Sequence, residues 1–236
     1  MSEPHGRIAL VTGASRGIGR AVAARLAEEG WKVIAVARSQ KALESLDDRI
    51  REIGGEATLV PLDLKDGAAI DQLGAELFNR FGHIDGLAAC AGVLGPTTPA
   101  HQVTPSAMDE AVAVNFTANY RLIRSLHPLL RASDAGRAVF VTSGIATNPL
   151  AYFGPYAASK AALDALVKTY AAETNITPIR ANLFSPGPVR TAMRAKAFPG
   201  EDANQHPAPE DVAPSITAML RADYNENGQT VRFQRA

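Results

Sequence analysis

Short apolar runs alternate with longer stretches of helical periodicity along most of the chain, and this alternation constrains the fold more than any other feature. Strand–helix–strand order produces parallel strands joined by right-handed crossovers, with helices on both faces of the sheet. A doubly wound α/β sheet is therefore favoured over a β-sandwich. The expected strands are 8–11, 33–37, 58–62, 86–90, 138–142 and 179–184, and the expected helices are 21–29, 42–53, 67–81, 106–130 and 155–173.

The length and composition fit one packed domain. A chain of 236 residues can bury its own core in a single α/β unit. Its residues are 46% hydrophobic and 20% charged, which is ordinary for a globular enzyme. We predict one Rossmann-like domain over residues 1–236. The polar, proline-containing stretch 198–214 is expected to be a lid or loop, and 230–233 a last strand.

The charge balance excludes a general attraction to polyanions. Lys plus Arg and Asp plus Glu each total 24, so no net field would draw the chain to nucleic acid or to an anionic membrane. The apolar runs fall far short of the roughly 20 residues that span a bilayer. The polar start, residues 1–7, has no room for a signal peptide. We expect a cytoplasmic protein.

Cysteine and histidine indicate neither a disulfide nor a metal site. The single cysteine, Cys90, cannot form an internal disulfide, which fits a reducing compartment. The five histidines show no metal-ligand spacing with it, so no metal is predicted. These histidines are His5, His83, His101, His127 and His206.

The first strand runs into a glycine-rich loop at residues 12–19, and helical periodicity starts at once at Ile18. Glycines let the backbone turn tightly and approach a pyrophosphate, while the following helix offers free N–H groups and the positive end of its dipole. The spacing, Gly-x-x-x-Gly-x-Gly, is not the commonest dinucleotide fingerprint. Its place between strand and helix nevertheless favours dinucleotide binding over a purely structural turn.

The end of the second expected strand favours NADP(H) over NAD. NAD-binding chains usually carry a carboxylate there for the ribose 2′-hydroxyl, and this chain has none. Arg38 stands there instead, and its guanidinium can pair with a 2′-phosphate, with Arg16 in the glycine loop as a second cation. The alternative is that Arg38 is only a solvated charge at the start of a loop.

Asp63 follows the third expected strand and has two interpretations. It can accept a hydrogen bond from the adenine amino group, or it can cap the next helix. Asp66 is closer to the start of that helix and is the better cap. We therefore favour the adenine contact for Asp63.

Four residues form a candidate catalytic group. Tyr156 and Lys160 lie four apart in one expected helix, so they share a face, and the ammonium is expected to lower the pKa of the phenol. Ser143 follows the fifth expected strand, at the edge where such sheets bind ligands, and could orient a carbonyl oxygen. Asn115 is a mediocre helix former inside an expected helix, which indicates a specific role, although an ordinary polar residue is the alternative.

In combination these motifs resemble the short-chain dehydrogenase/reductase family over nearly all of the chain. The family pattern Thr-Gly-x-x-x-Gly-x-Gly matches residues 12–19, and Tyr-x-x-x-Lys matches Tyr156 and Lys160. The family's serine, thirteen residues before the tyrosine, matches Ser143, and its asparagine in the fourth helix matches Asn115. Among the relatives, 3-oxoacyl reductases are only weakly suggested.

The resemblance implies roles for these residues. Tyr156 would be the general acid/base, Lys160 would lower its pKa and hold the nicotinamide ribose, Ser143 would position the substrate oxygen, and Asn115 would support a water in a proton relay. The turn after the sixth expected strand is similar to the family's segment near the nicotinamide carboxamide. The expected cofactor contacts are Gly13, Ser15, Arg16, Gly17, Ile18, Gly19, Arg38, Asp63, Leu64, Ala91, Gly92, Tyr156, Lys160, Pro186, Gly187, Val189 and Thr191.

The chain departs from the family at one place. Many members have Asn-Asn-Ala-Gly after the fourth strand, whereas this chain has Ala89, Cys90, Ala91 and Gly92. The polar side chains that usually brace the central sheet are therefore missing, which puts stability or cofactor affinity in doubt. Ala91 and Gly92 keep the small residues that allow a close approach to the adenosine ribose.

The function expected is an NADP(H)-dependent oxidoreductase acting on a small carbonyl or alcohol. A catalytically idle dinucleotide-binding sensor or scaffold is the alternative. An extended sugar epimerase would need a larger substrate domain than residues 190–236 allow. Substrate choice is expected to depend on 190–214 and 93–104, where Arg190, Arg194 and Lys196 could attract an acidic substrate or be a solvated cluster. Family analogy implies a homodimer or homotetramer through the helices 106–130 and 155–173.

Overall fold

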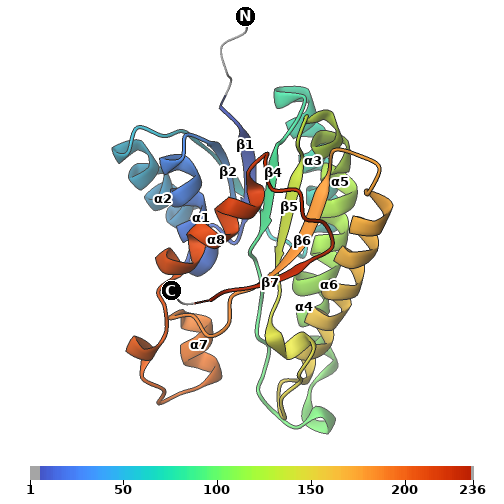
Figure 1. Cartoon of the computed structure of the whole chain (residues 1–236). Helices are drawn as coiled ribbons and strands as arrows, with labels where there is room; N and C mark the ends of the chain where they lie inside the picture. Colours follow the sequence, from blue (N-terminus) through green and yellow to red (C-terminus); the bar gives the residue numbers. More distant parts are fainter. Residues whose placement is uncertain (1–5, 235–236) are drawn as a thin grey trace, which may run out of the picture.

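In the computed structural model, which describes residues 6–234, seven parallel strands form one sheet in the order β3-β2-β1-β4-β5-β6-β7 (Figure 1). Residues 1–5, which include His5 and most of the polar start, lie outside the described residues, as do 235–236. The strands are β1 (Ile8–Thr12), β2 (Lys32–Ala37), β3 (Ala57–Pro61), β4 (Gly86–Ala89), β5 (Arg137–Val141), β6 (Arg180–Ser185) and β7 (Thr230–Arg232).

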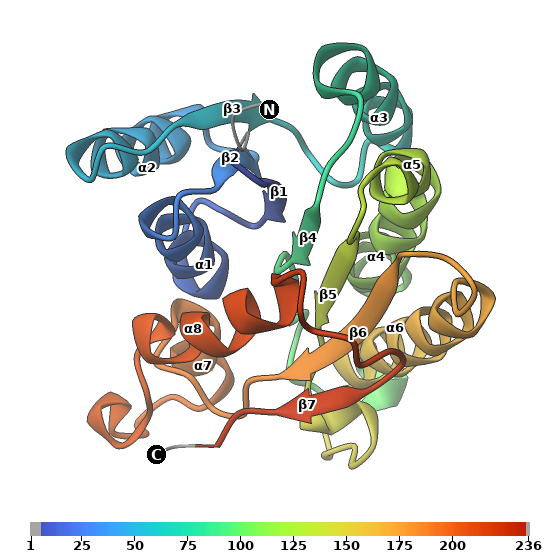
Figure 2. The same ribbon diagram turned by 45° about the horizontal axis from the view of Figure 1, so that its top comes forward.

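Helices cover both faces of this sheet, as Figure 2 shows. One face packs against α1 (Gly17–Glu28), α2 (Gln40–Glu52) and α8 (Pro209–Leu220). The other face packs against α3 (Gly67–Phe81), α5 (Ala118–Ala132) and α6 (Gly154–Glu173). The two shorter helices are α4 (Pro105–Val112) and α7 (Ala192–Ala197).

The pleat of β1 explains why all of its side chains face a core, so that apolar and polar residues do not alternate along the strand. Ile8 and Leu10 point to one core cluster, while Ala9 and Val11 point to the other. All five residues of the strand are buried because both faces of the sheet are covered. The predicted Rossmann-like parallel sheet is therefore confirmed.

The strand order places a topological switch in the middle of the sheet. β1 pairs with β2 on one side and with β4 on the other, so the connections leaving β1 and β4 diverge at their carboxyl ends. Open α/β sheets bind ligands in the crevice at this position. The glycine loop after β1 lies at this edge.

The C-terminal third departs most from the sequence-based expectation. The stretch 198–214 was expected to be a loop, but α8 already begins at Pro209 and contains Pro214. Proline is tolerated at the first helical position. The helix is held by its apolar face, on which Val212, Ile216 and Leu220 are fully buried. The short helix α7 was not predicted, whereas the last strand is confirmed as β7, paired with β6.

No helix among residues 6–234 combines the length and the apolar character that crossing a membrane requires.

Candidate active site

The glycine loop turns where only glycine fits. Gly13 and Gly17 have φ angles of 68° and 57°, in the left-handed region. A Cβ on Gly13 would lie 2.9 Å from the Cα of Ala91, and a Cβ on Gly19 would clash with the carbonyl oxygen of Gly13. The loop after β1 therefore packs directly against the loop after β4.

The N-terminus of α1 fits a pyrophosphate group. Arg16 is the N-cap of α1, its backbone is extended, and it makes no side-chain cap. No acidic residue lies in the first turn of α1. The first backbone N–H groups and the positive end of the helix dipole therefore remain available to an anion. A dinucleotide would place its phosphates here.

Two arginines lie beside this anion site. Arg16 and Arg38 are exposed, and Arg38 directly follows β2, whose Val36 is in register with Thr12 of β1. Within residues 6–234, neither arginine side chain forms an ion pair. Both guanidinium groups therefore remain available to a phosphate.

Asp63 is not a helix cap. Asp66 Oδ1 accepts a hydrogen bond of 3.0 Å from the amide of Ala69 and caps α3, as the sequence indicated. Asp63 Oδ1 accepts instead from the amide of Lys65 at 3.0 Å, which forms a local turn. Asp63 is half-buried at the carboxyl end of β3 and is not used by α3. The neighbouring Leu64 packs against the core.

The segment after β6 returns to the glycine loop. Its backbone turns at Gly187, whose φ is 67°, and Val189 is buried behind it. Thr191 caps α7, with Oγ1 accepting from the amide of Arg194 at 3.2 Å. Its methyl group lies 3.5 Å from where a Cβ on Gly17 would stand. The structure thus brings the predicted Pro186–Thr191 segment and the glycine loop together.

Asn115 interrupts the long helix predicted at 106–130. It lies fully buried in a π-helical turn, η2 (Ala113–Thr117), between α4 and α5. Its Oδ1 accepts from the amide of Val93 at 2.8 Å, and its Nδ2 donates to the carbonyl of Val93 at 2.9 Å. Asn115 therefore clamps the loop after β4, and π-turns of this kind are frequent at functional sites.

The clamp extends to the tyrosine helix through a serine that the sequence analysis missed. Nδ2 of Asn115 also donates to Oγ of Ser159 at 2.9 Å, and this hydroxyl donates to the carbonyl of Tyr156 at 3.1 Å. Ser159 is buried in α6, which packs against α4 and against the π-helical turn η2 that carries Asn115. Its position beside Lys160, within the same motif, was the available signal.

Lys160 is buried at the centre of the site. Its Nζ donates a hydrogen bond of 2.7 Å to the carbonyl oxygen of Val141, the last residue of β5. Burial lowers the pKa of Lys160 to about 8, and the carboxylate of Asp164 acts in the opposite direction. Asp164 accepts a hydrogen bond from the hydroxyl of Thr142. Thr142 and Asp164 were not predicted from the sequence.

Tyr156 corrects one expectation. Lys160 was expected to lower the pKa of the phenol, but Nζ lies 5.9 Å from the centroid of the Tyr156 ring and is engaged with Val141. Burial raises the pKa of Tyr156, and its side-chain hydrogen bond with Ser143 lowers it by less. The net direction is upward, because desolvation of the phenolate outweighs the stabilising contact. The phenol is therefore protonated near neutral pH.

Cys90 occupies a position at which many short-chain dehydrogenases have asparagine. Its thiol is uncharged near neutral pH. Burial raises the pKa of its thiol to about 12, against a smaller opposing effect of Lys160. The bracing that the missing polar side chains would supply is made elsewhere: Thr12 Oγ1 accepts from the amide of Ala91 at 3.2 Å, and Asn115 holds Val93. Gly92, between them, faces Asn115 Oδ1 and Lys160 Nζ.

Comparison with known proteins agrees with this geometry. The family model described as short chain dehydrogenase matches residues 7–202. The chain belongs to the short-chain dehydrogenase/reductase family. An uncharacterized oxidoreductase of Escherichia coli K12, YciK, is 37% identical over 220 residues, covering 92% of this chain and 87% of the relative. The family resemblance is thereby confirmed, and the comparisons do not single out the 3-oxoacyl reductases.

Solved structures of other members share the whole fold. A short chain dehydrogenase of Shigella flexneri in complex with NADP superposes with a TM-score of 0.92 at 34% identity, covering 96% of each chain. One of Escherichia coli in complex with NADPH gives 0.90 at 34% identity and covers 96% of this chain and 95% of its own. Both complexes contain the cofactor that Arg16 and Arg38 indicate here.

Proposed function

We propose that this short-chain dehydrogenase/reductase is an NADP(H)-dependent oxidoreductase that interconverts a carbonyl compound and a secondary alcohol, with Tyr156 as general acid/base. The observation that carries the proposal is the convergence of Tyr156, Ser143 and Lys160 at the carboxyl end of β5, next to a glycine loop that fits a pyrophosphate. The cofactor is NADP(H), supported by the free guanidinium groups of Arg16 and Arg38 and by the NADP and NADPH complexes of its relatives.

Each side chain has a chemical role in carbonyl reduction. When bound, NADPH supplies the hydride. Ser143 holds the substrate oxygen, and Tyr156, protonated near neutral pH, delivers the proton to that oxygen. Lys160, an ammonium below about pH 8, offsets the negative charge left on the phenolate. Asn115 fixes the loop after β4 and the backbone of Tyr156.

The remaining predicted residues line the cofactor path. The glycine loop with Ser15 and Ile18 would face the pyrophosphate, Asp63 and Leu64 the adenine, and Ala91 with Gly92 the adenosine ribose. Pro186, Gly187, Val189 and Thr191 would face the nicotinamide. The position of Thr191 supports this arrangement, since its methyl group lies 3.5 Å from where a Cβ on Gly17 would stand.

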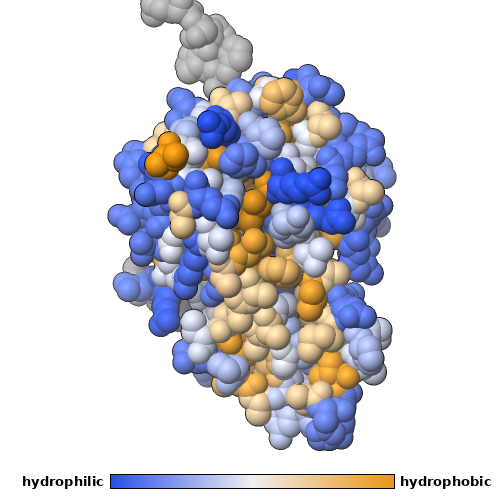
Figure 3. Space-filling model, turned by 90° about the vertical axis from the view of Figure 1, so that its right-hand side faces the viewer, coloured by the Kyte–Doolittle hydropathy of each residue, from blue (hydrophilic) through white to orange (hydrophobic). Residues whose placement is uncertain are grey.

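The side of the molecule formed by α5 and α6 is a candidate interface between subunits. α6 exposes Ala158, Ala161 and Ala165 on one side, and Figure 3 shows a continuous apolar area over the side of the molecule that α5 and α6 form. Small side chains let a second helix approach closely, so we assign this side to the interface of a homodimer or homotetramer.

A cytoplasmic location is supported by the free thiol of Cys90.

The test is a fluorescence titration of the purified protein with NADPH and NADH, followed by a carbonyl panel with wild type and Tyr156→Phe. We expect tighter binding of NADPH, turnover of at least one ketone, and a loss of about a thousandfold or more in kcat for Tyr156→Phe at unchanged NADPH affinity. Tyr224→Phe, a partly buried tyrosine after α8 that packs on the core of the opposite face of the sheet, is the matched control. NADPH binding without turnover of any carbonyl would instead support the idle sensor.

A further inference from the structure

The segment after β6 closes on itself to form a compact loop. The amide of Arg190 donates a hydrogen bond of 2.9 Å to the carbonyl of Pro207, so the two ends of the segment 190–207 lie side by side. Compact surface loops whose ends meet in this way are frequently functional. Between these ends lie α7 and the 3₁₀ turn η4 (Ala203–Gln205).

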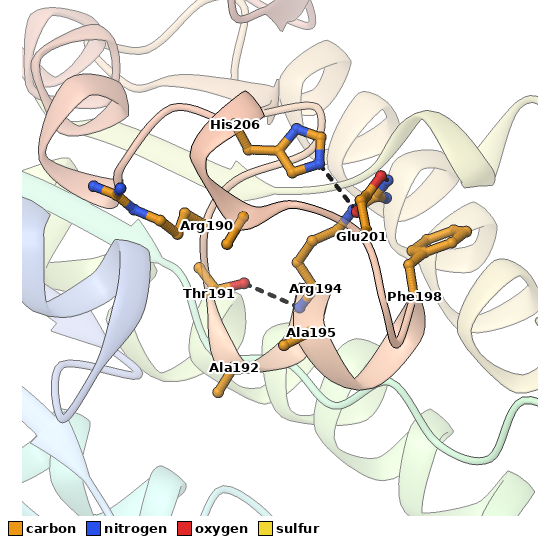
Figure 4. Close-up of a pocket in the computed structure, with 9 residues that line it drawn as sticks. Arg190, Thr191, Ala192, Arg194, Ala195, Phe198, Glu201 and His206 are labelled. Atoms are coloured by element: carbon orange, nitrogen blue, oxygen red, sulfur yellow. Dashed lines mark hydrogen bonds and ion pairs between the residues drawn. The ribbon is translucent and has the colours of Figure 1, made fainter.

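An open cavity of about 330 Å³ lies within this loop. Among residues 6–234, those that line it all fall between 190 and 206, and Figure 4 shows them around it. Its wall includes Ala192, Ala195 and Ala203, which are exposed, so this apolar surface is uncovered. Ligand sites have volumes of roughly 300–1,000 Å³ and mostly apolar walls with a few polar groups. The cavity is therefore large enough for a small organic molecule.

The helix α7 separates this cavity from the catalytic tyrosine. Met193 and Ala197, one helical turn apart, pack on the same buried cluster as Tyr156. Ala192 and Ala195 line the cavity instead. Because residues three or four apart share one face of a helix, α7 presents one face to the catalytic group and another to the cavity. The cavity is therefore distinct from the place at which Tyr156 acts.

Glu201, the acidic residue of the cavity wall, is already paired. The Nε and Nη2 atoms of Arg194 each lie 2.6 Å from a carboxylate oxygen of Glu201. Nε2 of His206 lies 3.0 Å from the same carboxylate, and Figure 4 shows Arg194 and His206 converging on it. Hydrogen bonds from Arg194 hold the pKa of Glu201 at about 2, so the carboxylate is ionised near neutral pH. Its charge is thus committed to Arg194 and His206.

Arg190 adds a second guanidinium to the cavity wall, and within residues 6–234 it forms no ion pair. Its side chain is exposed. Nη1 lies 3.5 Å from Oδ1 of Asn204, at the outer limit of a hydrogen bond, which places the guanidinium at the edge of the cavity beside η4. A guanidinium can hold a carboxylate through two parallel hydrogen bonds. The cavity thus combines an uncovered apolar wall with a cation that is available to an anion.

We propose that this cavity is a second binding site and that it holds a small organic carboxylate, apart from the site of carbonyl reduction. The guanidinium of Arg190 binds the carboxylate, and the exposed alanines contact the apolar body of the ligand. Both contacts are favourable, because the cation acquires a partner and apolar surface leaves water. A ligand favours the conformation that it binds, so a carboxylate bound here stabilises α7 beside the catalytic group.

The experiment titrates benzoate, benzamide and inorganic phosphate into the purified protein by calorimetry, with and without NADPH. Benzamide has the shape of benzoate without its charge, and phosphate has charge without an apolar body. We expect benzoate to bind about tenfold or more tightly than either compound, with the same Kd at saturating NADPH. Benzoate that binds no better than benzamide or phosphate, or that competes with NADPH, would overturn the inference.

Three variants locate the site. Arg190→Gln removes the charge and should raise the Kd for benzoate about tenfold, without changing the Kd for NADPH. Ala195→Leu fills the cavity from α7 and should weaken benzoate binding by a similar factor. Lys196→Gln removes an exposed charge of α7 that does not line the cavity, and as the matched control it should leave the Kd for benzoate unchanged. Equal Kd values for wild type and Arg190→Gln, or an equal loss in Lys196→Gln, would show that the carboxylate binds elsewhere.

Hydrogen exchange measures the effect on α7. We expect saturating benzoate to slow exchange of the amides in residues 191–198 several-fold in the wild type and in Tyr156→Phe alike, but not in Arg190→Gln. Neither the titration nor the exchange measurement requires turnover, so a carbonyl panel without turnover would count against the proposed function alone. Unchanged exchange at saturating benzoate would contradict the stabilisation of α7.

Discussion

Lys160 and Asp164 lie one helical turn apart on α6, and both charged side chains are buried. The carboxylate of Asp164 accepts from the hydroxyl of Thr142, while the ammonium donates to the carbonyl of the preceding residue, Val141. The end of β5 thus binds both members of the pair. Asp164 raises the pKa of Lys160 against the larger lowering by burial. Asp164 therefore favours the ammonium form of Lys160, and we expect it to act as a positioning residue.

Asp164→Asn should shift the alkaline limb of the pH–rate profile. The groups that face Lys160 are Asp164, Cys90 and Tyr156, and Asp164 exerts the largest effect that favours the ammonium. Its removal lowers the pKa of Lys160 below about 8, so we expect kcat to fall about one pH unit earlier as pH rises. Glu173→Gln, at the exposed end of the same helix, is the control. A profile identical to that of the wild type would rule out this role.

Lys160→Met should stabilise the fold while removing activity. Burial holds the pKa of Lys160 at about 8 against an ordinary 10.5, so below pH 8 the folded protein carries a buried ammonium at a cost on the order of 3 kcal/mol. Met keeps the volume without the charge, but leaves the Val141 carbonyl unpaired, which costs about 1 kcal/mol. We expect a net gain of about 2 kcal/mol in the free energy of unfolding at pH 7, measured in urea.

The pH dependence of this stability gain tests whether it comes from removal of a buried ammonium. Between about pH 8 and 10.5 the unfolded chain binds the lysine proton more than the folded protein does, so the lysine makes the free energy of unfolding rise with pH. The difference between Lys160→Met and wild type should therefore shrink at pH 9.5. A variant that is less stable at pH 7, with the same difference at both pH values, would contradict burial of a charged lysine.

Gly92→Ala should disturb the catalytic group directly. A Cβ on Gly92 would lie 3.2 Å from Oδ1 of Asn115, so Asn115 must shift by a few tenths of an ångström, and it would lie in van der Waals contact with Nζ of Lys160 at 3.6 Å. We expect kcat to fall about tenfold with a stability loss of about 1 kcal/mol or less, because misplacement of catalytic groups affects rate more than folding. Gly144→Ala is the matched control, since a Cβ there meets no atom within 4 Å. Equal kinetics for the two variants would refute the contact.

The sheet and the glycine loop could be predicted because local periodicity and turn chemistry determine them. Buried parallel strands give unbroken apolar runs. The helix 67–81 was predicted with its observed ends and with Asp66 as its cap, and the structure ends it at Gly82 in the left-handed region. Asn115 was predicted to have a specific role because asparagine is a poor helix former. The structure gives the reason: Asn115 lies in a π-helical turn, and its side-chain amide bonds both the N–H and the carbonyl of Val93.

The remaining features depend on packing that a sequence does not display. Pro214 argued against a helix, yet α8 forms because burial of its apolar face against α1 outweighs the lost hydrogen bond. Thr142 and Asp164 are 22 residues apart and become partners only when α6 packs on β5. The upward shift of the Tyr156 pKa depends on burial, which spacing along a helix cannot reveal.

Arg38→Asp should reverse the cofactor preference. Arg38 directly follows β2 and forms no ion pair within residues 6–234, so its guanidinium is free for a 2′-phosphate. A charge-assisted hydrogen bond contributes about 1.5–3 kcal/mol, so we expect the Kd for NADPH to rise about 10- to 100-fold. The Kd for NADH should stay constant or fall, because the carboxylate can accept from a ribose 2′-hydroxyl. Arg49→Asp, in the last turn of α2, is the matched control. If Arg38→Asp weakens NADPH and NADH equally in fluorescence titrations, Arg38 contributes general charge and does not recognise the 2′-phosphate.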